Sequence, residues 1–299
     1  MRRVWQPNRL NKLLLYRHQK SIRHFSARTM KVLTVPLMDD NYGYILVDEA
    51  TNEAAIVDVS SQPKIMLDEV SKHGLNLVKV LTTHKHWDHA GGNNEVKTAY
   101  PDIDICGSRV DNVEGCSKFV GDGDEFMVTA NIKVSCIVTP GHTQGHVCYL
   151  ASSDDAANKI IFTGDCLFVG GCGRFFEGTA AEMLPALQKL AALPDDTEVY
   201  CGHEYTTANY KFNLSVQPKN PHLLEANAAL LQKRAANIPS VPTTIGQERL
   251  TNPFLQCCDL ALYNSFSPVP NQDGVPACGD ITDPVVVLGH LRERKNKFK

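Results

Sequence analysis

The segment Thr83-His84-Lys85-His86-Trp87-Asp88-His89 constrains the fold more than any other part of the chain. Three histidines and one aspartate fall close together, directly after the apolar residues 78–82, which we predict to be a buried strand. Neutral imidazole and ionised carboxylate are good ligands for zinc and iron. On an extended chain His84 and His86 project to the same side. Asp88 and His89 then follow a bend and face a second position, so this one loop is predicted to serve two adjacent metal ions.

Three further candidate ligands each stand at the end of a strand-like run, beside a glycine that lets the backbone turn sharply. They are His142 in Thr139-Pro140-Gly141-His142-Thr143, Asp165 in Phe162-Thr163-Gly164-Asp165, and His203 in Tyr200-Cys201-Gly202-His203. An aspartate between two cations can place one oxygen on each, which suits Asp165. A single loop histidine or aspartate is more often a hydrogen-bonded structural residue. The whole set nevertheless favours one shared metal site, and we expect His146 to be structural or to support a ligand.

The remaining pattern predicts an α/β domain followed by a helical region. Strands are expected at residues 32–35, 44–47, 55–57, 78–82, 103–106, 132–138, 147–150, 160–163 and 198–201. Helices are expected at residues 64–73, 180–193, 205–216 and 221–236, and within 282–295. Residues 257–280 are rich in Pro, Gly, Asn and Ser and are predicted to form a long loop. We therefore expect a catalytic domain at 30–205 and a helical domain at 206–299, and the pattern leaves the strand order open.

The first 29 residues differ in charge from the rest of the chain. They carry eight basic side chains and no acidic one, whereas residues 30–299 carry 22 basic and 33 acidic side chains. A basic, acid-free leader is typical of a mitochondrial presequence, and the alternative is a basic tail without that role. A second start at Met30 would give a cytoplasmic form. The acidic body argues against nucleic-acid binding, which needs clustered positive charge.

Two further features bear on the location of the chain. No stretch approaches the roughly 20 apolar residues that cross a bilayer, so we expect no membrane span and no membrane partner. The ten cysteines contain no CxxC pair, and several lie in apolar runs where cysteine behaves as a small hydrophobe. We therefore expect free thiols in a reducing compartment rather than disulfides.

The metal motifs resemble those of a known family. THKHWDH resembles the HxHxDH signature of the metallo-β-lactamase superfamily, and TPGHTQGH, FTGD and YCGHEYT resemble its later ligand motifs. Their order and spacing are similar to those of glyoxalase II, also called hydroxyacylglutathione hydrolase, from about Met30 to Lys299. The resemblance implies an α/β fold, namely an αββα sandwich with a C-terminal α-helical domain. It implies one metal on His84, His86 and His142, a second on Asp88, His89 and His203, Asp165 as the bridge, and Asp58 as a brace for the ligand loop.

The resemblance also extends to the substrate side, with departures. Residues 171–178 resemble a glutathione-contacting loop that usually carries Lys and Tyr where Arg174 and Phe176 stand. Arg keeps the charge with a different donor geometry, and Phe176 lacks a hydroxyl. The resemblance assigns Tyr205, Arg292 and Lys295 to glutathione contacts, the last two to its glycine carboxylate. The alternative for Arg292 and Lys295 is a solvated basic tail. The loop at 257–280 is longer than the family usually has.

The resemblance implies hydrolysis of S-(2-hydroxyacyl)glutathione thioesters, with S-D-lactoylglutathione giving glutathione and D-lactate. Two divalent cations about 3.5 Å apart would share a hydroxide that attacks the thioester carbonyl. Asp88 and Asp165, the expected catalytic residues, would balance the charge of the cations. We expect zinc, although the same ligands accept iron or manganese, and we expect a monomer.

Other functions compete with this interpretation. A persulfide dioxygenase of the same fold uses a single iron and needs fewer protein ligands than the seven present here. Another superfamily hydrolase, such as a lactonase or a nuclease, is disfavoured by the acidic body and the glutathione-type tail. A non-enzymatic protein that binds metal or glutathione is disfavoured by the intact ligand set.

Overall fold

The first half of the chain forms a six-stranded sheet with the strand order β1-β2-β3-β4-β5-β6. The structure is a computed structural model that describes residues 30–153, 159–264 and 282–298. Strands β1 to β3 are antiparallel and β3 to β6 are parallel. The strands are β1 (Met30–Leu37), β2 (Asn41–Asp48), β3 (Glu53–Val57), β4 (Asn76–Leu81), β5 (Asp104–Ser108) and β6 (Lys118–Val120). Three helices connect them: α2 (Pro63–Lys72), α3 (Trp87–Ala90) and α4 (Asn93–Ala99).

A second six-stranded sheet has the order β14-β13-β10-β9-β8-β7 and is antiparallel except for the β10–β13 pair. Its strands are β7 (Glu125–Met127), β8 (Lys133–Val138), β9 (Val147–Ser152), β10 (Ile160–Gly164), β13 (Glu198–Cys201) and β14 (Thr243–Thr244). A small hairpin of β11 (Leu167–Phe168) and β12 (Gly171–Cys172) follows β10. Helix α5 (Ala180–Ala191) follows this hairpin.

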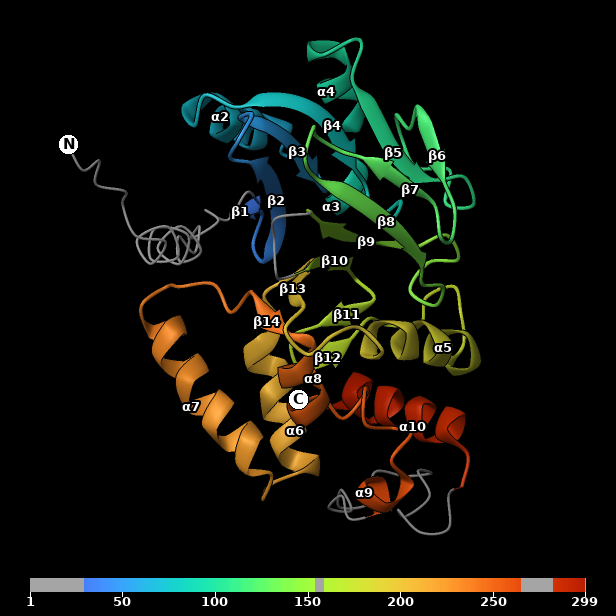
Figure 1. Cartoon of the computed structure of the whole chain (residues 1–299). Helices are drawn as coiled ribbons and strands as arrows, with labels where there is room; N and C mark the ends of the chain where they lie inside the picture. Colours follow the sequence, from blue (N-terminus) through green and yellow to red (C-terminus); the bar gives the residue numbers. More distant parts are fainter. Residues whose placement is uncertain (1–29, 154–158, 265–281, 299) are drawn as a thin grey trace, which may run out of the picture.

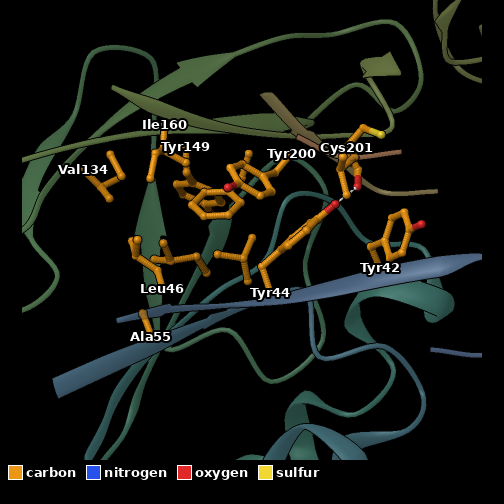
Figure 2. Close-up of a cluster of buried hydrophobic side chains, with 14 of the residues drawn as sticks. Tyr42, Tyr44, Leu46, Ala55, Val134, Tyr149, Ile160, Tyr200 and Cys201 are labelled. Carbon is orange, nitrogen blue, oxygen red and sulfur yellow. Dashed lines mark hydrogen bonds between the residues drawn. The ribbon is translucent and has the colours of Figure 1, made fainter. Parts of the chain in front are cut away.

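The two sheets pack face to face because apolar side chains alternate along their strands. In β2, Tyr44 and Leu46 point into the core between the sheets, where they meet Tyr149 of β9 (Figure 2). In the same strand, Ile45 and Val47 point the other way and join a cluster with α2 and α4. The outer face of the second sheet is covered in the same manner by α5 and α10. Helices thus flank both sheets (Figure 1), and the expected αββα sandwich is confirmed.

Beyond residue 205 the chain is mostly helical, as expected. The helices are α6 (Thr206–Val216), α7 (Pro221–Ala235), α8 (Ile245–Thr251), α9 (Leu260–Asn264) and α10 (Pro284–Lys297). Side-chain caps begin several of them: the Asn220, Thr244 and Asp283 side chains accept backbone N–H groups in the first turns of α7, α8 and α10. This region also supplies β14 to the second sheet and shares a hydrophobic cluster with α5. Residues 206–264 and 282–298 therefore pack as an extension of the sandwich.

Most expected elements are present, and one prediction is partly wrong. Residues 257–280 were expected to be a loop, but α9 begins at Leu260, with Asp259 accepting the N–H of Leu262. The short apolar run before Asn264 forms this turn of helix, whereas the Pro- and Gly-rich residues 265–281 lie outside the described residues. The short elements α3, α4, β6, β7, β11, β12, β14 and α8 were not predicted.

Two findings concern cysteine and the membrane. The nine cysteines in the described ranges are free, and seven of them are buried, which agrees with the expected thiols; Cys278 and the leader at 1–29 lie outside those ranges. In the same part of the chain, no helix is both long and apolar enough to cross a bilayer.

Candidate metal centre

The histidine-rich loop leaves the first sheet at the end of β4. His84 and His86 lie on the extended stretch after the strand, and His86 precedes the first turn of α3. The His89 N–H donates to the His86 carbonyl at 2.9 Å. The bend expected before Asp88 and His89 is therefore one turn of helix, and it turns these two side chains toward a second position.

The three distant candidates arrive from the second sheet. His142 follows β8, Asp165 follows β10, and His203 follows β13, so all three lie at one edge of the sandwich. Glycine is required beside two of them. Gly164 has a φ of +43°, and a Cβ there would lie 2.5 Å from Thr83 Oγ1. A Cβ at Gly202 would collide with the Asp165 carboxylate.

Two groups of ligand atoms result. In the first, His86 Nδ1 lies 2.9 Å from His84 Nε2 and 3.0 Å from His142 Nε2. These separations suit three nitrogens bound to one ion at about 2.0–2.1 Å. In the second group, His89 Nε2 and His203 Nε2 are 3.3 Å apart, and they lie 3.5 Å and 3.4 Å from Asp88 Oδ2. The structure brings all seven predicted ligands together.

The Asp165 carboxylate lies between the two groups. Its Oδ2 is 3.4 Å from His142 Nε2 of the first group and 3.4 Å from His203 Nε2 of the second. Its Oδ1 is 3.4 Å from His89 Nε2. This buried Oδ1 has no hydrogen-bond partner among the residues that the structure describes. A buried carboxylate oxygen without a donor is costly unless a cation satisfies it, so the donor set fits a pair of metal ions bridged by Asp165.

Outer partners fix the protonation of three histidines. The Nδ1–H of His142 donates to the Arg174 carbonyl at 3.0 Å, because a carbonyl only accepts. The Nδ1–H groups of His89 and His203 donate to carboxylates at 2.9 Å each, on Asp58 and Asp40 respectively. In its neutral form, each of these imidazoles therefore directs its Nε2 lone pair into the centre. This carboxylate–histidine arrangement is typical of protein metal sites.

The electrostatics of the two groups differ. Burial lowers the pKa of His84 well below its ordinary value and that of His142 to about 4, so both imidazoles are neutral donors. Burial also opposes the charged form of His89, but the nearby carboxylates, above all Asp165, outweigh it and raise its pKa to about 9. The pKa of Asp165 lies well below its usual range despite burial, because His89 lies beside it. The second group therefore sits in a negative field that attracts a cation.

Asp58 and His146 support the ligands from behind. Asp58 accepts the Thr83 N–H and the Thr83 hydroxyl at 2.8 Å each, in addition to His89. It therefore contacts the ligand loop as a brace would. His146 is fully buried and does not join either group; its Nε2 accepts the Asp165 N–H at 3.1 Å, and its Nδ1 contacts Thr139 Oγ1 at 2.8 Å.

Two residues beside the centre were missed from sequence. Asp40 holds His203, and the Asn41 side chain donates to Asp88 Oδ2 at 3.0 Å. Asp40 precedes β2 and Asn41 begins it, and both lie between the strands expected at 32–35 and 44–47, where Asp and Asn are common as turn residues. Only the tertiary structure shows that Asp40 and Asn41 lie beside the centre. The start of β2 is held next to the second sheet because the Tyr42 N–H donates to the Gly202 carbonyl at 2.8 Å.

Comparison with known proteins identifies the family. Residues 39–113 and 122–203 match the sequence model of the metallo-beta-lactamase superfamily, and residues 204–298 match that of the hydroxyacylglutathione hydrolase C-terminus. The protein named hydroxyacylglutathione hydrolase cytoplasmic from Arabidopsis thaliana is 45% identical over 228 residues, which cover 76% of this chain and 88% of that relative. The chain belongs to the hydroxyacylglutathione hydrolase family.

Two other relatives show how far this likeness extends. A hydroxyacylglutathione hydrolase-like protein from Gallus gallus is 39% identical over 272 residues, which cover 90% of this chain and 91% of the relative. A solved structure named ETHE1 from Myxococcus xanthus has a TM-score of 0.55 and 28% identity, covering 75% of this chain and 84% of the other. Hydroxyacylglutathione hydrolase relatives therefore match this chain over nearly its whole length, including the helical region.

Two of the substrate residues expected for a hydroxyacylglutathione hydrolase flank the metal centre. Phe176 is exposed, and its ring centroid is 5.1 Å from that of His142 in the first group. Tyr205 stacks on His203 of the second group at 4.7 Å, with its ring nearly parallel. Arg174 is also exposed, and its carbonyl holds His142. The two aromatic rings thus lie on either side of the centre.

The other two expected substrate residues lie on α10 and are packed against the body of the protein. Arg292 is only 8% exposed and donates to the Cys172 carbonyl at 2.8 Å. Lys295 Nζ donates to the Ala208 carbonyl at 2.6 Å. The alternative of a solvated basic tail is therefore wrong for Arg292. Its backbone contact also ties α10 to the hairpin that precedes Arg174 and Phe176.

Proposed function

We propose that this chain hydrolyses S-(2-hydroxyacyl)glutathione thioesters, and that S-D-lactoylglutathione is its substrate, giving glutathione and D-lactate. The observation that carries the proposal is the pair of ligand groups bridged by Asp165 in a hydroxyacylglutathione hydrolase family member. The names of the relatives supply the substrate class. The two groups weigh against the one-iron persulfide dioxygenase alternative.

We assign two divalent cations to the centre. His84, His86 and His142 would hold one, Asp88, His89 and His203 would hold the other, and Asp165 would bridge them. Zinc is our assignment, with iron or manganese as alternatives, because imidazole and carboxylate accept all three. When bound, the cations supply Lewis acidity that lowers the pKa of water and polarises a carbonyl.

The chain's own residues prepare the centre for this chemistry. Asp88 and Asp165 would offset the charge of two dications and so help the centre to retain both. Asp58 and Asp40 hold His89 and His203 through Nδ1, which keeps each Nε2 lone pair directed inward. The leaving group is a thiolate, which departs without a strong general acid. Thioester hydrolysis therefore needs no residue as proton donor, and we assign that role to none.

Substrate contacts are assigned to side chains at the rim of the centre. Arg174, Phe176 and Tyr205 would contact the glutathione moiety, and Arg292 and Lys295 would bind its glycine carboxylate. These last two side chains lie close together on α10, since burial and the charge of Arg292 together lower the pKa of Lys295, and such a pair of cations can bind one carboxylate. The loss of a hydroxyl at Phe176 predicts that one hydrogen bond to the tripeptide is missing.

The decisive experiment expresses residues 30–299 and follows the loss of S-D-lactoylglutathione absorbance, with metal content measured on the same preparation. We expect turnover with close to two metals per chain, and loss of turnover in His86→Ala and Asp165→Ala. A protein with one iron that shows no thioesterase activity, but consumes oxygen with glutathione persulfide, would favour the dioxygenase instead.

We also propose a location and an oligomeric state. The basic, acid-free leader supports import into the mitochondrial matrix, and β1 begins at Met30, so a form that starts there keeps every described element. Such a form would remain in the cytoplasm, and amino-terminal sequencing of both cell fractions tests this. We propose a monomer, and light scattering of the purified protein tests it.

A further inference from the structure

The three-histidine group is assembled from both sheets. His84 and His86 follow β4 of the first sheet, whereas His142 follows β8 of the second. His86 Nδ1 and His142 Nε2 are nevertheless only 3.0 Å apart. Metal sites tolerate deviations of about 0.2 Å in ligand distance. The first metal site therefore requires something that holds the two loops in a fixed relation.

Asp111 lies where these two loops meet. It follows β5 and is only 3% exposed. Its Oδ2 accepts the backbone N–H of Lys85, the residue between His84 and His86, at 3.1 Å. The same oxygen accepts the hydroxyl of Thr143, next to His142, at 2.6 Å, and Oδ1 accepts the Gly145 N–H at 2.6 Å. One buried carboxylate thus takes donors from both ligand loops.

The local sequence permits this close approach. A Cβ on Gly145 would lie 2.6 Å from Asp111 Oδ1 and 2.5 Å from the Asp111 backbone nitrogen, so only glycine leaves room for the carboxylate. Thr143 is completely buried, so its hydroxyl needs an internal partner, and Asp111 accepts its hydrogen bond. Hydrogen bonds to a carboxylate are about twice as strong as those between neutral groups.

We propose that Asp111 is a positioning residue for the three-histidine metal site, and that it sets the distance of His142 from His84 and His86. The hydrogen bonds of the Asp111 carboxylate described above go to neighbours of the three histidines and not to their imidazoles. It acts through Lys85, Thr143 and Gly145. The link between this role and turnover rests on the proposed thioester hydrolysis, whereas the role in metal binding does not.

Other links between the two loops are weaker or more distant. Glu177 pairs with Lys85 Nζ at 2.6 Å and accepts the Gln144 N–H at 3.0 Å. The Glu177 and Lys85 side chains are about one-third exposed, so solvent screens their ion pair. The Val147 N–H also donates to the Thr83 carbonyl at 2.9 Å, behind the ligands. Asp111, by contrast, is buried and accepts a hydrogen bond from Thr143, the residue next to His142.

The test is Asp111→Asn, with Asp48→Asn as its matched control. An amide keeps the size of the carboxylate, but its nitrogen cannot accept the Lys85 or Gly145 N–H. Asp48 is also a fully buried carboxylate that joins two loops: it accepts the Ala50 and Asn131 backbone N–H groups and the Thr129 hydroxyl. Asp48 lies at the other end of β2 from Asn41. Asp48→Asn should therefore lower the stability of the protein as Asp111→Asn does, but without changing a contact of the ligand loops.

The readouts are metal content after dialysis against a chelator buffer, zinc affinity by competition, and thermal unfolding. We expect Asp111→Asn to retain about one metal per chain, to bind the other about 10–100-fold more weakly, and to regain thioesterase activity in excess zinc. Asp48→Asn should keep both metals and show no response to added zinc. Thr143→Ala removes one of the three hydrogen bonds, so the affinity for the same metal should fall by a smaller factor. If Asp111→Asn does not fold, Thr143→Ala is the variant that tests the proposal.

Each contrary outcome is distinct. Two tightly held metals in folded Asp111→Asn, loss of both metals, or equal metal loss in Asp48→Asn would each overturn the assignment. If the parent protein binds two metals but does not hydrolyse S-D-lactoylglutathione, the proposed function fails, and the metal measurements still decide the role of Asp111.

Discussion

Glu248 provides a quantitative test of how the helical region is joined to the sandwich. It lies on α8 and is fully buried. Its Oε2 accepts the Gly170 N–H from the β11–β12 turn at 2.8 Å and the Asn252 amide at 2.9 Å. Its Oε1 contacts the Thr243 hydroxyl at 3.0 Å. Burial raises its pKa from 4.5 to about 7, and these hydrogen bonds offset the rise only in part.

The sign of the pH dependence follows from this shift. Between pH 4.5 and 7 the unfolded chain releases the Glu248 proton, while the folded protein keeps it. The contribution of Glu248 to stability is therefore fully present below pH 4.5 and is lost as the pH rises through 7. Each unit of pKa shift corresponds to about 1.4 kcal/mol, so the loss between pH 5 and pH 8 is about 2.5 kcal/mol.

The assay is urea unfolding of the parent and Glu248→Gln at pH 5 and at pH 8. Glutamine keeps the shape, since its oxygen can accept from Gly170 and its amide can donate to Thr243. We expect the stability of the variant relative to the parent to rise by about 2.5 kcal/mol between the two pH values. Taking the difference between the proteins cancels titrations that they share. This prediction would be refuted if the difference in unfolding free energy between the two proteins changed by less than about 0.5 kcal/mol between pH 5 and pH 8.

Three further predictions follow from other contacts. Asp58→Ala leaves Thr83 N–H and His89 Nδ1–H without their acceptor, so zinc affinity measured by competition should fall about 10–100-fold; unchanged affinity would contradict the role of Asp58 as a brace. Phe254→Ala removes a fully buried ring, so urea unfolding should show that the free energy of unfolding falls by about 3–5 kcal/mol. A decrease of less than about 1 kcal/mol would contradict this prediction. Burial lowers the pKa of Lys295 to about 8, so its positive charge is lost above that pH. KM for S-D-lactoylglutathione should therefore rise between pH 7 and 9, less so in Lys295→Arg, and a flat KM would exclude Lys295 as a carboxylate contact.

The ligand set was accessible from sequence because its members carry local signals. Three histidines and an aspartate follow one apolar run, and the other three candidates each stand beside a glycine at the end of a strand-like run. Such residues at strand ends can gather only if their strands end at a common edge, and the structure brings them there. The same logic missed Asp40, Asn41 and Asp111, because a polar residue in a turn looks the same whether or not another loop packs against it.

Burial and strand order were decided by the tertiary structure. Arg292 lies in a charged stretch that is typical of a solvent-exposed segment. It is buried because α10 packs against α5 and because its guanidinium donates to the Cys172 carbonyl. The two-residue strand β14 has no periodicity to detect and forms only because β13 offers it an edge.

The sequence by itself determined the chemistry of this protein, because the side chains that bind metals are of few types and occur here in a compact pattern. It also determined the alternation that makes each strand amphipathic. Only the tertiary structure decided which carboxylates hold which histidines, since contacts such as that of Asp111 with Thr143 join segments 32 residues apart on different sheets. Long-range hydrogen bonds of this kind depend on the relative position of two packed layers, which no local pattern encodes.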